Sequence, residues 1–213
     1  MIATLADRGA TINMQILAEA YQEGLSACHR LDKETSGCLL YAKDAEAYRK
    51  AAIQFEKREI NKKYHAFVHG VHSFARKEVD LPIRTLAKGG VVTDLFKGKP
   101  ALTFFDTIQC YRSYSLIACQ PVSGRMHQIR VHLSKLEAPI INDELYGGQP
   151  LYLSTLKRNY NLKKWEEEKP LIQRFALHAF QLTFNTFDEE KIVESPYPKD
   201  LKALHRQLEK HGV

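Results

Sequence analysis

The sequence predicts an α+β fold built on a mostly antiparallel sheet. Strand-like runs outnumber helical periodicities, and the two kinds of segment interleave irregularly instead of alternating one to one. The chain has 213 residues, of which 44% are hydrophobic. This length suits one large domain or two small ones and can bury a sizeable core. No internal repeat or low-complexity linker divides it.

The N-terminal part predicts two helices on either side of a short strand. Asn13 is the expected N-cap of a first helix that ends at Gly24. The turn signal Thr-Ser-Gly precedes an apolar run at residues 38–42, which predicts a strand. Asp44 is the expected N-cap of a second, amphipathic helix, because apolar residues recur at i, i+3, i+4 and i+7, namely Tyr48, Ala51, Ala52 and Phe55.

The middle of the chain reads mainly as strands. Residues 62–70 open with two lysines and continue as an apolar strand. Residues 79–83 and 90–94 predict short strands around Gly and Pro turns. Residues 101–110 and 115–122 are rich in β-branched and aromatic side chains and predict a hairpin.

Residues 126–133 alternate between apolar and polar side chains, which predicts a further strand. The expected apolar face carries Ile129, Val131 and Leu133, and the expected polar face carries Gln128, Arg130 and His132. Such a strand would present Arg130 outward, where its guanidinium can hold a carboxylate with two hydrogen bonds.

The C-terminal third begins with a turn at residues 139–148. Residues 154–170 are strongly charged and predict a surface excursion with a short helix. A strand is expected at residues 177–187. Pro198 then precedes an amphipathic helix that carries Leu201, Leu204 and Leu208 on its apolar face.

The charge balance favours a polyanionic partner. Lysine and arginine total 31 against 25 acidic residues, which gives a net charge of +6 and a pI of about 9.0. The four cysteines form no C-x-x-C pair, and three of them lie in apolar strand-like runs, so we expect reduced core thiols. No apolar run is long enough for a membrane span and the start lacks a signal-peptide pattern, so the expected location is the cytoplasm.

Asp32 is the first candidate for chemistry. It lies between Arg30 and Lys33 on a predicted loop beside a strand, where reactive side chains are often held. The alternative is that Asp32 only caps its turn and pairs with Arg30. Tyr64 can offer an aromatic face to a base or be a half-buried strand residue, and Arg130 can hold a catalytic carboxylate or form an ordinary ion pair.

Five segments taken together resemble the RluA-type RNA pseudouridine synthases. The order and approximate spacing of the segments match that family: His-Arg-Leu-Asp at residues 29–32, Lys-Tyr at 63–64, Gly-Arg-Met-His-Gln-Ile-Arg-Val-His at 124–132, Asp-Glu-Leu-Tyr-Gly at 143–147 and Leu-His-Ala at 177–179. The resemblance implies the pseudouridine synthase fold, a single domain over residues 1–213 with a long mixed sheet, flanking helices and a central cleft.

The resemblance also implies roles for particular residues. Asp32 would be the catalytic residue, Tyr64 would stack on the uracil and has been proposed as a general base, and Arg130 would contact the catalytic aspartate. Arg30 would enter the RNA and help to displace the target nucleotide, and Leu177 would line the base pocket. The basic segment 123–135 lacks acidic residues, and its Arg125, His127 and Gln128 are expected to bind RNA together with the lysines and arginine of residues 57–63.

The implied reaction is the isomerisation of uridine to pseudouridine in structured ribosomal or transfer RNA. The N1–C1′ bond breaks, the base rotates and C5 bonds to C1′, so no cofactor is required. The protein is expected to act as a monomer. The alternative is a non-catalytic RNA-binding module, which would fit the charge but leave Asp32 without a role.

Two further expectations concern metals and the N-terminus. Histidines 65, 69 and 72, or 127 and 132, lack the spacing of a metal site, so we expect no metal. Family members usually carry a strand pair ending in Lys-Pro before the His-Arg-Leu-Asp segment, whereas only 28 residues precede His29 here. Residues 4–8 would fall just after that motif, so the expectation is that either the start is truncated or this member lacks the usual first strands. The chain is also expected to lack any S4-like domain.

Overall fold

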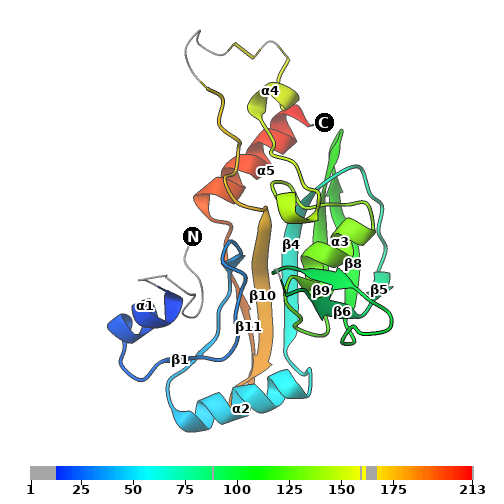
Figure 1. Cartoon of the computed structure of the whole chain (residues 1–213). Helices are drawn as coiled ribbons and strands as arrows, with labels where there is room; N and C mark the ends of the chain where they lie inside the picture. Colours follow the sequence, from blue (N-terminus) through cyan, green and yellow to red (C-terminus); the bar gives the residue numbers. More distant parts are fainter. Residues whose placement is uncertain (1–12, 88, 159, 162–166, 213) are drawn as a thin grey trace. The chain divides into compact units, whose positions relative to one another are not determined.

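The computed structural model describes residues 13–87, 89–158, 160–161 and 167–212 (Figure 1). It divides into two compact units. The first comprises Met1–Lys63 and Ala179–Pro196, and the second comprises Tyr64–His178 and Tyr197–Val213. The single domain expected over residues 1–213 stays a prediction. The expectation for residues 4–8 lies outside the described residues.

The first helix of the first unit confirms its predicted cap. Helix α1 spans Met14–Tyr21, and the Asn13 side chain accepts a hydrogen bond of 3.0 Å from the Ile16 N–H. The helix ends at Tyr21, three residues before the predicted stop at Gly24, because Gln22 is already extended with a φ of −153°. Gly24 has a φ of 83° in the turn that follows. Strands β1 (Ser26–Ala27) and β3 (Tyr41–Ala42) then pair in antiparallel fashion.

The predicted strand at residues 38–42 is wrong in its extent. Two short strands, β2 (Ser36–Gly37) and β3, replace it, and residues 38–40 between them are not in a strand. The reason is that the chain changes its hydrogen-bonding partner between β2 and β3. The Cys38 N–H donates to the Ala179 carbonyl of β10 (Leu177–Asn185) at 2.8 Å, whereas β3 pairs with β1. The chain between them crosses from one partner to the other and cannot form one continuous ladder.

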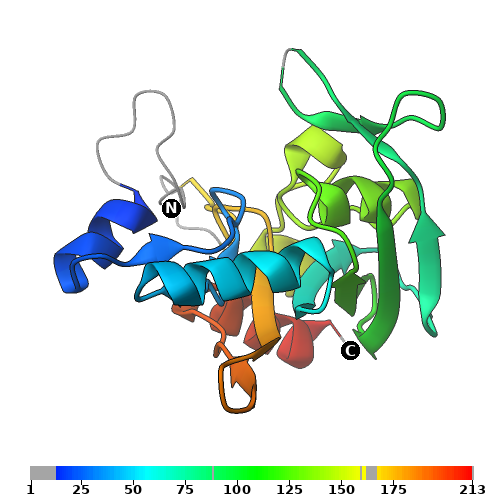
Figure 2. The ribbon, with the colours of Figure 1, turned by 90° about the horizontal axis from the view of Figure 1, so that it is seen from below.

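Helix α2 (Ala45–Glu56) confirms the prediction from Asp44, whose side chain accepts from the Ala47 N–H at 2.7 Å. Its Gln54 fixes it to the end of β10: the amide nitrogen donates to the Asn185 carbonyl at 2.9 Å, and the Asn185 N–H donates back at 2.7 Å. Figures 1 and 2 show α2 lying across this end of the strand. A small core holds the unit together through Cys38, Ile60, Leu182, Leu40, Phe55 and Phe184.

Strand β11 (Glu190–Glu194) completes the first unit and was not predicted. It pairs in antiparallel fashion with β10, from Gln181 opposite Glu194 to Asn185 opposite Glu190. All five of its residues are exposed. A strand with three charged residues and no buried face gives no period-2 signal in the sequence.

The second unit is built on an antiparallel sheet in the order β4–β9–β8–β5. The strands are β4 (Asn61–His69, whose first three residues belong to the first unit), β9 (Tyr114–Pro121), β8 (Leu102–Cys110) and β5 (Lys77–Asp80). The strand predicted at 62–70 and the hairpin of β8 and β9 are confirmed. The strand predicted at 79–83 is instead split at Leu81-Pro82 between β5 and β6 (Ile83–Thr85), and β6 pairs with β7 (Val91–Thr93).

The strand predicted at residues 126–133 is wrong: this segment forms helix α3, Gln128–Lys135. The alternation of apolar and polar residues gave a wrong prediction because every residue from Gln128 to Leu133 is buried, including the polar ones. A helix buried all round shows no apolar stripe when its polar side chains are satisfied by hydrogen bonds inside the protein. Arg130 therefore does not lie on the exposed face of a strand.

The remaining elements are short, apart from the last helix. A 3₁₀ turn η1 spans Glu144–Tyr146, and α4 spans Leu153–Leu156 at the start of the predicted charged excursion, of which residues 159 and 162–166 lie outside the described residues. Helix α5 (Lys199–His211) confirms the prediction, and it buries Leu201, Leu204 and Leu208 completely.

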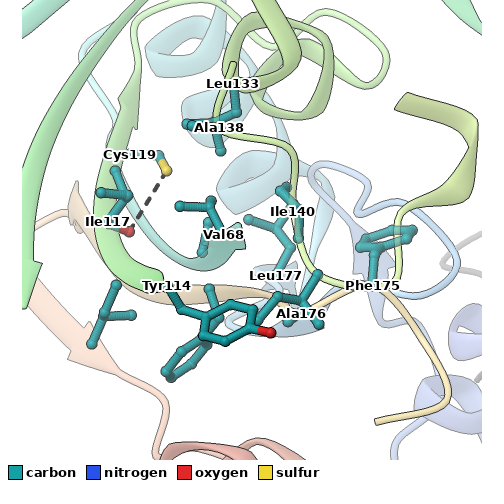
Figure 3. Packing of buried hydrophobic residues seen from close by; sticks show 14 of the residues in the cluster. Val68, Tyr114, Ile117, Cys119, Leu133, Ala138, Ile140, Phe175, Ala176 and Leu177 are labelled. Atoms are coloured by element: carbon teal, nitrogen blue, oxygen red, sulfur yellow. Dashed lines mark hydrogen bonds between the residues drawn. The ribbon is translucent and has the colours of Figure 1, made fainter. Parts of the chain in front are cut away.

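The core of the second unit gathers side chains from β4, β9, α3 and the segments beside them (Figure 3). The N–H of Ile141 donates to the Phe67 carbonyl at 2.9 Å, and the N–H of Ala176 donates to the Ile141 carbonyl at 3.0 Å. The segment around Ile141 is therefore hydrogen-bonded to β4 on one side and to the residue before β10 on the other. These helices and antiparallel strands confirm the α+β class.

Two smaller expectations can be compared with the structure. Cys38 and Cys119 are buried as expected, whereas Cys110 is exposed, because it lies at the end of β8 where the sheet stops. In the part of the chain that the structure describes, no helix has the length and apolar character needed to cross a membrane.

Candidate functional site

Asp32 lies on a tight turn of the first unit. The Asp32 carbonyl accepts a hydrogen bond of 2.9 Å from the Thr35 N–H, and Thr35 itself is buried. The Asp32 side chain is half-buried, while Arg30 and Lys33 on either side are exposed. The turn thus fixes the backbone of Asp32 and leaves two cationic side chains beside it.

His29 anchors this loop, a role that the sequence reasoning missed. Its Nε2 accepts a hydrogen bond of 3.0 Å from the Leu40 N–H, and its ring lies 5.1 Å from the Phe55 ring of α2. Burial, together with the nearby Lys62 charge, lowers the pKa of His29 to about 4. The imidazole is therefore neutral at pH 7, as its acceptor role requires.

Gly37 lets the same loop approach β10. Its φ is 118°, and a Cβ at this position would lie 2.1 Å from the Ala179 carbonyl oxygen. Only glycine fits such a contact without moving the backbone. The Thr-Ser-Gly sequence thus marks a close packing of the Asp32 loop on the strand, in addition to a turn.

The basic segment at residues 57–63 includes one lysine with an unusual environment. Burial and, to a lesser degree, the positive charge of Arg58 lower the pKa of Lys62 to about 8. Arg58 has a φ of 61°, in the left-handed region just after α2. Lys57 and Lys63 on either side complete the cationic segment.

Tyr64 and Leu177 both belong to the second unit. Tyr64 is half-buried on β4 opposite Cys119, with its ring packed against the core. Leu177 is only 3% exposed and lies among the core side chains at the start of β10 (Figure 3). Its expected contact with a base stays a prediction.

Arg130 is the central charged residue of the second unit. Its Nε and Nη2 donate to the two carboxylate oxygens of Asp143, both at 2.7 Å. The guanidinium carbon lies 4.2 Å from the centre of the Phe175 ring and 4.9 Å from that of Tyr146. The side chains of Arg130 and Asp143 are 7% and 1% exposed, so this is a buried bidentate ion pair held by aromatic contacts.

The aromatic contact continues to the start of α3. The Tyr146 hydroxyl accepts from the Val91 N–H at 3.0 Å and can donate to Nδ1 of His127 at 2.8 Å. His127 has a φ of 50°, in the left-handed region, so the chain turns sharply there before the helix begins. Tyr146 thereby connects α3, η1 and the hairpin of β6 and β7.

Gln128 fixes the loop that carries Arg125. Its amide oxygen accepts from the Ser123 hydroxyl at 2.7 Å and from the Arg125 N–H at 3.0 Å. Its amide nitrogen donates to the Leu102 carbonyl and the Thr103 hydroxyl, both at 2.9 Å. Gln128 is buried and its side-chain amide makes four hydrogen bonds, so its observed role is to hold the loop. Arg125, in contrast, is exposed. Its expected contact with RNA stays a prediction.

The structure divides the predicted site residues between the two units. Asp32 and Arg30 belong to the first, and the second contains Tyr64, Arg125, His127, Gln128, Arg130 and Leu177. Within the second unit, Arg125, His127, Gln128 and Arg130 are brought together at the start of α3. The expected contact of Arg130 with Asp32 stays a prediction. The sequence reasoning assigned no role to Asp143, Tyr146 or Phe175, although the first two belong to the segment Asp-Glu-Leu-Tyr-Gly.

The histidines considered as metal ligands have other partners. His65 Nδ1 is 2.6 Å from the Tyr197 hydroxyl, His69 Nε2 is 2.9 Å from the Gln149 carbonyl, and His72 Nε2 is 2.9 Å from the His69 carbonyl. His132 lies between the Thr103 hydroxyl and the Leu81 carbonyl. Within the described ranges, no group of three or more His, Cys, Asp or Glu residues is arranged to hold a metal ion.

Comparison with known proteins gives a consistent set of matches. Residues 6–135, more than half of the chain, match the family model described as RNA pseudouridylate synthase. The chain is 36% identical over 179 residues to the ribosomal large subunit pseudouridine synthase C of Buchnera aphidicola, covering 83% of this chain and 53% of that protein. It is 32% identical over 207 residues to the ribosomal large subunit pseudouridine synthase D of Vibrio vulnificus, covering 92% and 60%.

Solved structures agree with the sequence matches. The human RNA pseudouridylate synthase domain containing 4 superimposes with a TM-score of 0.73 at 25% identity, covering 98% of this chain and 93% of that chain. The human RNA pseudouridylate synthase domain containing 1 gives a TM-score of 0.69, also at 25% identity, with 92% and 83% covered. The chain spans 53% and 60% of the length of the two bacterial relatives.

Proposed function

The chain belongs to the RNA pseudouridylate synthase family, and from this premise we propose that it isomerises uridine to pseudouridine in RNA, with Asp32 as the catalytic carboxylate. The observation that carries the proposal is the His-Arg-Leu-Asp segment at residues 29–32, in which His29 anchors a tight turn that presents Asp32 beside Arg30. The two bacterial relatives named above are ribosomal large subunit enzymes, so we propose large-subunit ribosomal RNA as the substrate ahead of transfer RNA. Such a substrate would place the protein in the cytoplasm.

The proposed reaction needs no oxidant, reductant or metal. The N1–C1′ bond breaks, the uracil rotates, a C5–C1′ bond forms, and the proton on C5 is lost while N1 gains one. Atoms and electrons therefore balance within the nucleotide. The target nucleotide has to leave its stack before C1′ becomes accessible, which costs a few kcal/mol. The exposed cation of Arg30, two residues from Asp32, is suited to replace the displaced base and offset that cost.

The second unit would hold the substrate. Tyr64, half-buried on β4, is proposed to stack on the uracil, and base stacking of this kind contributes roughly 1–3 kcal/mol. Arg125 and His127 are proposed to contact RNA, and Gln128 to act through the backbone of Arg125. Asp143, Phe175 and Tyr146 hold the guanidinium of Arg130 in place.

The decisive experiment compares Asp32→Asn with a matched control. Asp32→Asn keeps the size of the side chain but removes its charge, so turnover on large-subunit ribosomal RNA should be abolished while RNA affinity stays similar or rises slightly. Asp44→Asn removes the same charge at the α2 N-cap, where asparagine caps equally well, and it should keep full activity. Near-normal turnover by Asp32→Asn would reject the mechanism.

Mapping of pseudouridine in cellular RNA, with and without the gene, identifies the target position. The expected result is the loss of one or a few pseudouridines from large-subunit ribosomal RNA. An unchanged map, together with a purified protein that is inert on ribosomal and transfer RNA, would favour the non-catalytic RNA-binding module instead.

A further inference from the structure

We propose that the loop formed by residues 94–100 of the second unit is an RNA-contacting element, in which Phe96 stacks on an unpaired base. The inference rests on the proposed function, since it takes RNA as the partner, and it adds a contact that the predicted site residues do not include.

The loop exposes two large apolar side chains at its tip. Phe96 is 96% exposed and Leu95 beside it is 71% exposed. An aromatic side chain held in water contributes little to the stability of the unit, and adjacent exposed apolar residues are typical of interaction sites. Phe96 is therefore available for a contact with another molecule.

Hydrogen bonds hold the backbone of the loop, so Phe96 does not stand on an unsupported tip. The Asp94 carboxylate accepts from the N–H groups of Phe96 and Lys97, at 3.0 and 2.9 Å, and from the Nε of Arg84 at 2.6 Å. The Gly98 N–H donates to the Asp94 carbonyl, and the backbones of Ile83 and Lys99 exchange two hydrogen bonds. Phe96 is thus presented on a fixed backbone, so little entropy is lost when it binds.

The charges around the tip favour a polyanion. Lys97, Lys99 and Arg125 are exposed, and the Nε of Arg125 donates to the Pro100 carbonyl at the base of the loop at 3.2 Å. Asp94 is the only acidic residue between Leu81 and Phe105, and its carboxylate is occupied by Arg84 and the loop backbone. An aromatic ring bordered by cations matches the way proteins bind single-stranded RNA, with stacking on the bases and cations on the phosphates. A protein partner would be a poorer match for this charge.

The test measures binding of a fluorescein-labelled RNA hairpin with an unpaired loop, and of a fully paired RNA duplex, to the whole protein. Phe96→Ala should weaken hairpin binding about fivefold or more, the low end for loss of one stacked base, and should change duplex binding little. Phe96→Trp should keep or increase the affinity, whereas Phe96→Leu should behave like Phe96→Ala, because leucine is apolar but cannot stack.

Phe187→Ala is the matched control. Phe187 is also an exposed aromatic residue, 59% exposed with the Lys50 ammonium 4.2 Å from its ring centre, but it is followed by Asp188, Glu189 and Glu190. Those carboxylates repel phosphates, so Phe187→Ala should leave hairpin binding unchanged. Melting temperatures of both variants should match that of the unmodified protein.

Three outcomes overturn the inference: unchanged hairpin binding by Phe96→Ala, full binding by Phe96→Leu, or an equal loss with Phe187→Ala. Full binding by Phe96→Leu would mean that residue 96 makes an apolar contact with the RNA and does not stack on a base. The proposed function is judged separately by turnover of the unmodified protein. Turnover with no effect of Phe96→Ala rejects only the inference, and an effect on binding without any turnover rejects only the function.

Discussion

At the scale of single residues, the bidentate pair of Arg130 and Asp143 is the most consequential contact of the second unit. Arg130→Met would leave the Asp143 carboxylate buried without its cation, and breaking one side of a buried pair costs roughly 3–5 kcal/mol. Combining Arg130→Met with Asp143→Asn should cost less than the sum of the two single changes, because they share one interaction. Urea unfolding of the four proteins measures this coupling.

An exposed ion pair gives the control for that experiment. The Lys191 and Glu189 side chains are paired but are 47% and 59% exposed, so Lys191→Met should change the free energy of unfolding by about 1 kcal/mol or less. Strict additivity of Arg130→Met and Asp143→Asn would mean that the buried pair does not contribute as a unit.

His29 predicts a dependence of stability on pH. Its pKa is about 4 in the folded protein against an ordinary value near 6.5, so the unfolded chain binds more protons between these values. The contribution of His29 to stability is therefore complete above pH 6.5 and is lost as the pH falls toward 4, by at most about 1.4 kcal/mol per pH unit. His29→Gln should remove this part of the acid sensitivity, since the amide oxygen can accept from the Leu40 N–H without titrating.

Unfolding free energies at several pH values between about 4 and 7 measure the effect. Equal slopes for His29→Gln and the unmodified protein would contradict a buried, neutral His29.

At the scale of elements, the sequence predicts best where a side chain caps or terminates a segment. Asn13 and Asp44 locate the starts of α1 and α2, and Pro198 precedes α5, because each acts within one turn of its own position. The alternating pattern at residues 126–133 gave a wrong prediction, because Gln128, Arg130 and His132 make their hydrogen bonds to residues far away in the sequence. No local pattern carries that information.

The same distinction applies to the candidate site. The His-Arg-Leu-Asp segment and the Gly-Arg-Met-His-Gln-Ile-Arg segment could be selected from the sequence because they are contiguous. The partner of Arg130 could not be predicted from the sequence, because Asp143 is 13 residues away. The two residues pair only once α3 and the turn before η1 have packed together. The anchoring of the Asp32 loop by His29 likewise depends on Phe55, which is brought near by α2.

Gly37 gives a prediction about an element, the contact of β2 with β10. Gly37→Ala would place a methyl group 2.1 Å from the Ala179 carbonyl oxygen, so the loop that carries Asp32 has to move. Turnover should fall about tenfold or more, since a displacement of about 1 Å in an active site can cost that much, and the melting temperature should fall as well. Gly89→Ala is the control, since Gly89 also has a positive φ, 91°, but nothing lies within 4 Å of the added Cβ.

Gly89→Ala should therefore cost only the strain of a left-handed alanine, about 1 kcal/mol, and keep its turnover. Comparable losses of turnover in the two variants would show that backbone strain, and not the close approach to Ala179, is what makes Gly37 necessary.

At the scale of the whole molecule, the net charge of +6 is concentrated in particular segments. Residues 57–63 of the first unit carry Lys57, Arg58, Lys62 and Lys63 against a single glutamate, and residues 123–135 of the second carry Arg125, Arg130 and Lys135 with no acidic residue. Arg130 is paired internally, whereas Arg125 and Lys57 are exposed. The exposed cations, and not the total charge, should therefore set the strength of RNA binding.

This predicts a definite salt dependence. RNA affinity should fall as salt rises, and each exposed cation that contacts a phosphate should contribute roughly 0.7–0.9 to the slope of log K against log salt concentration. Lys57→Gln and Arg125→Gln should each reduce the slope by about that amount, and together by about twice as much, because they lie in different units and would neutralise different phosphates. Lys202→Gln is the control: Lys202 is exposed on α5, outside both basic segments, and its loss should leave the slope unchanged. A slope that stays the same in the double variant would mean that the RNA lies elsewhere on the protein.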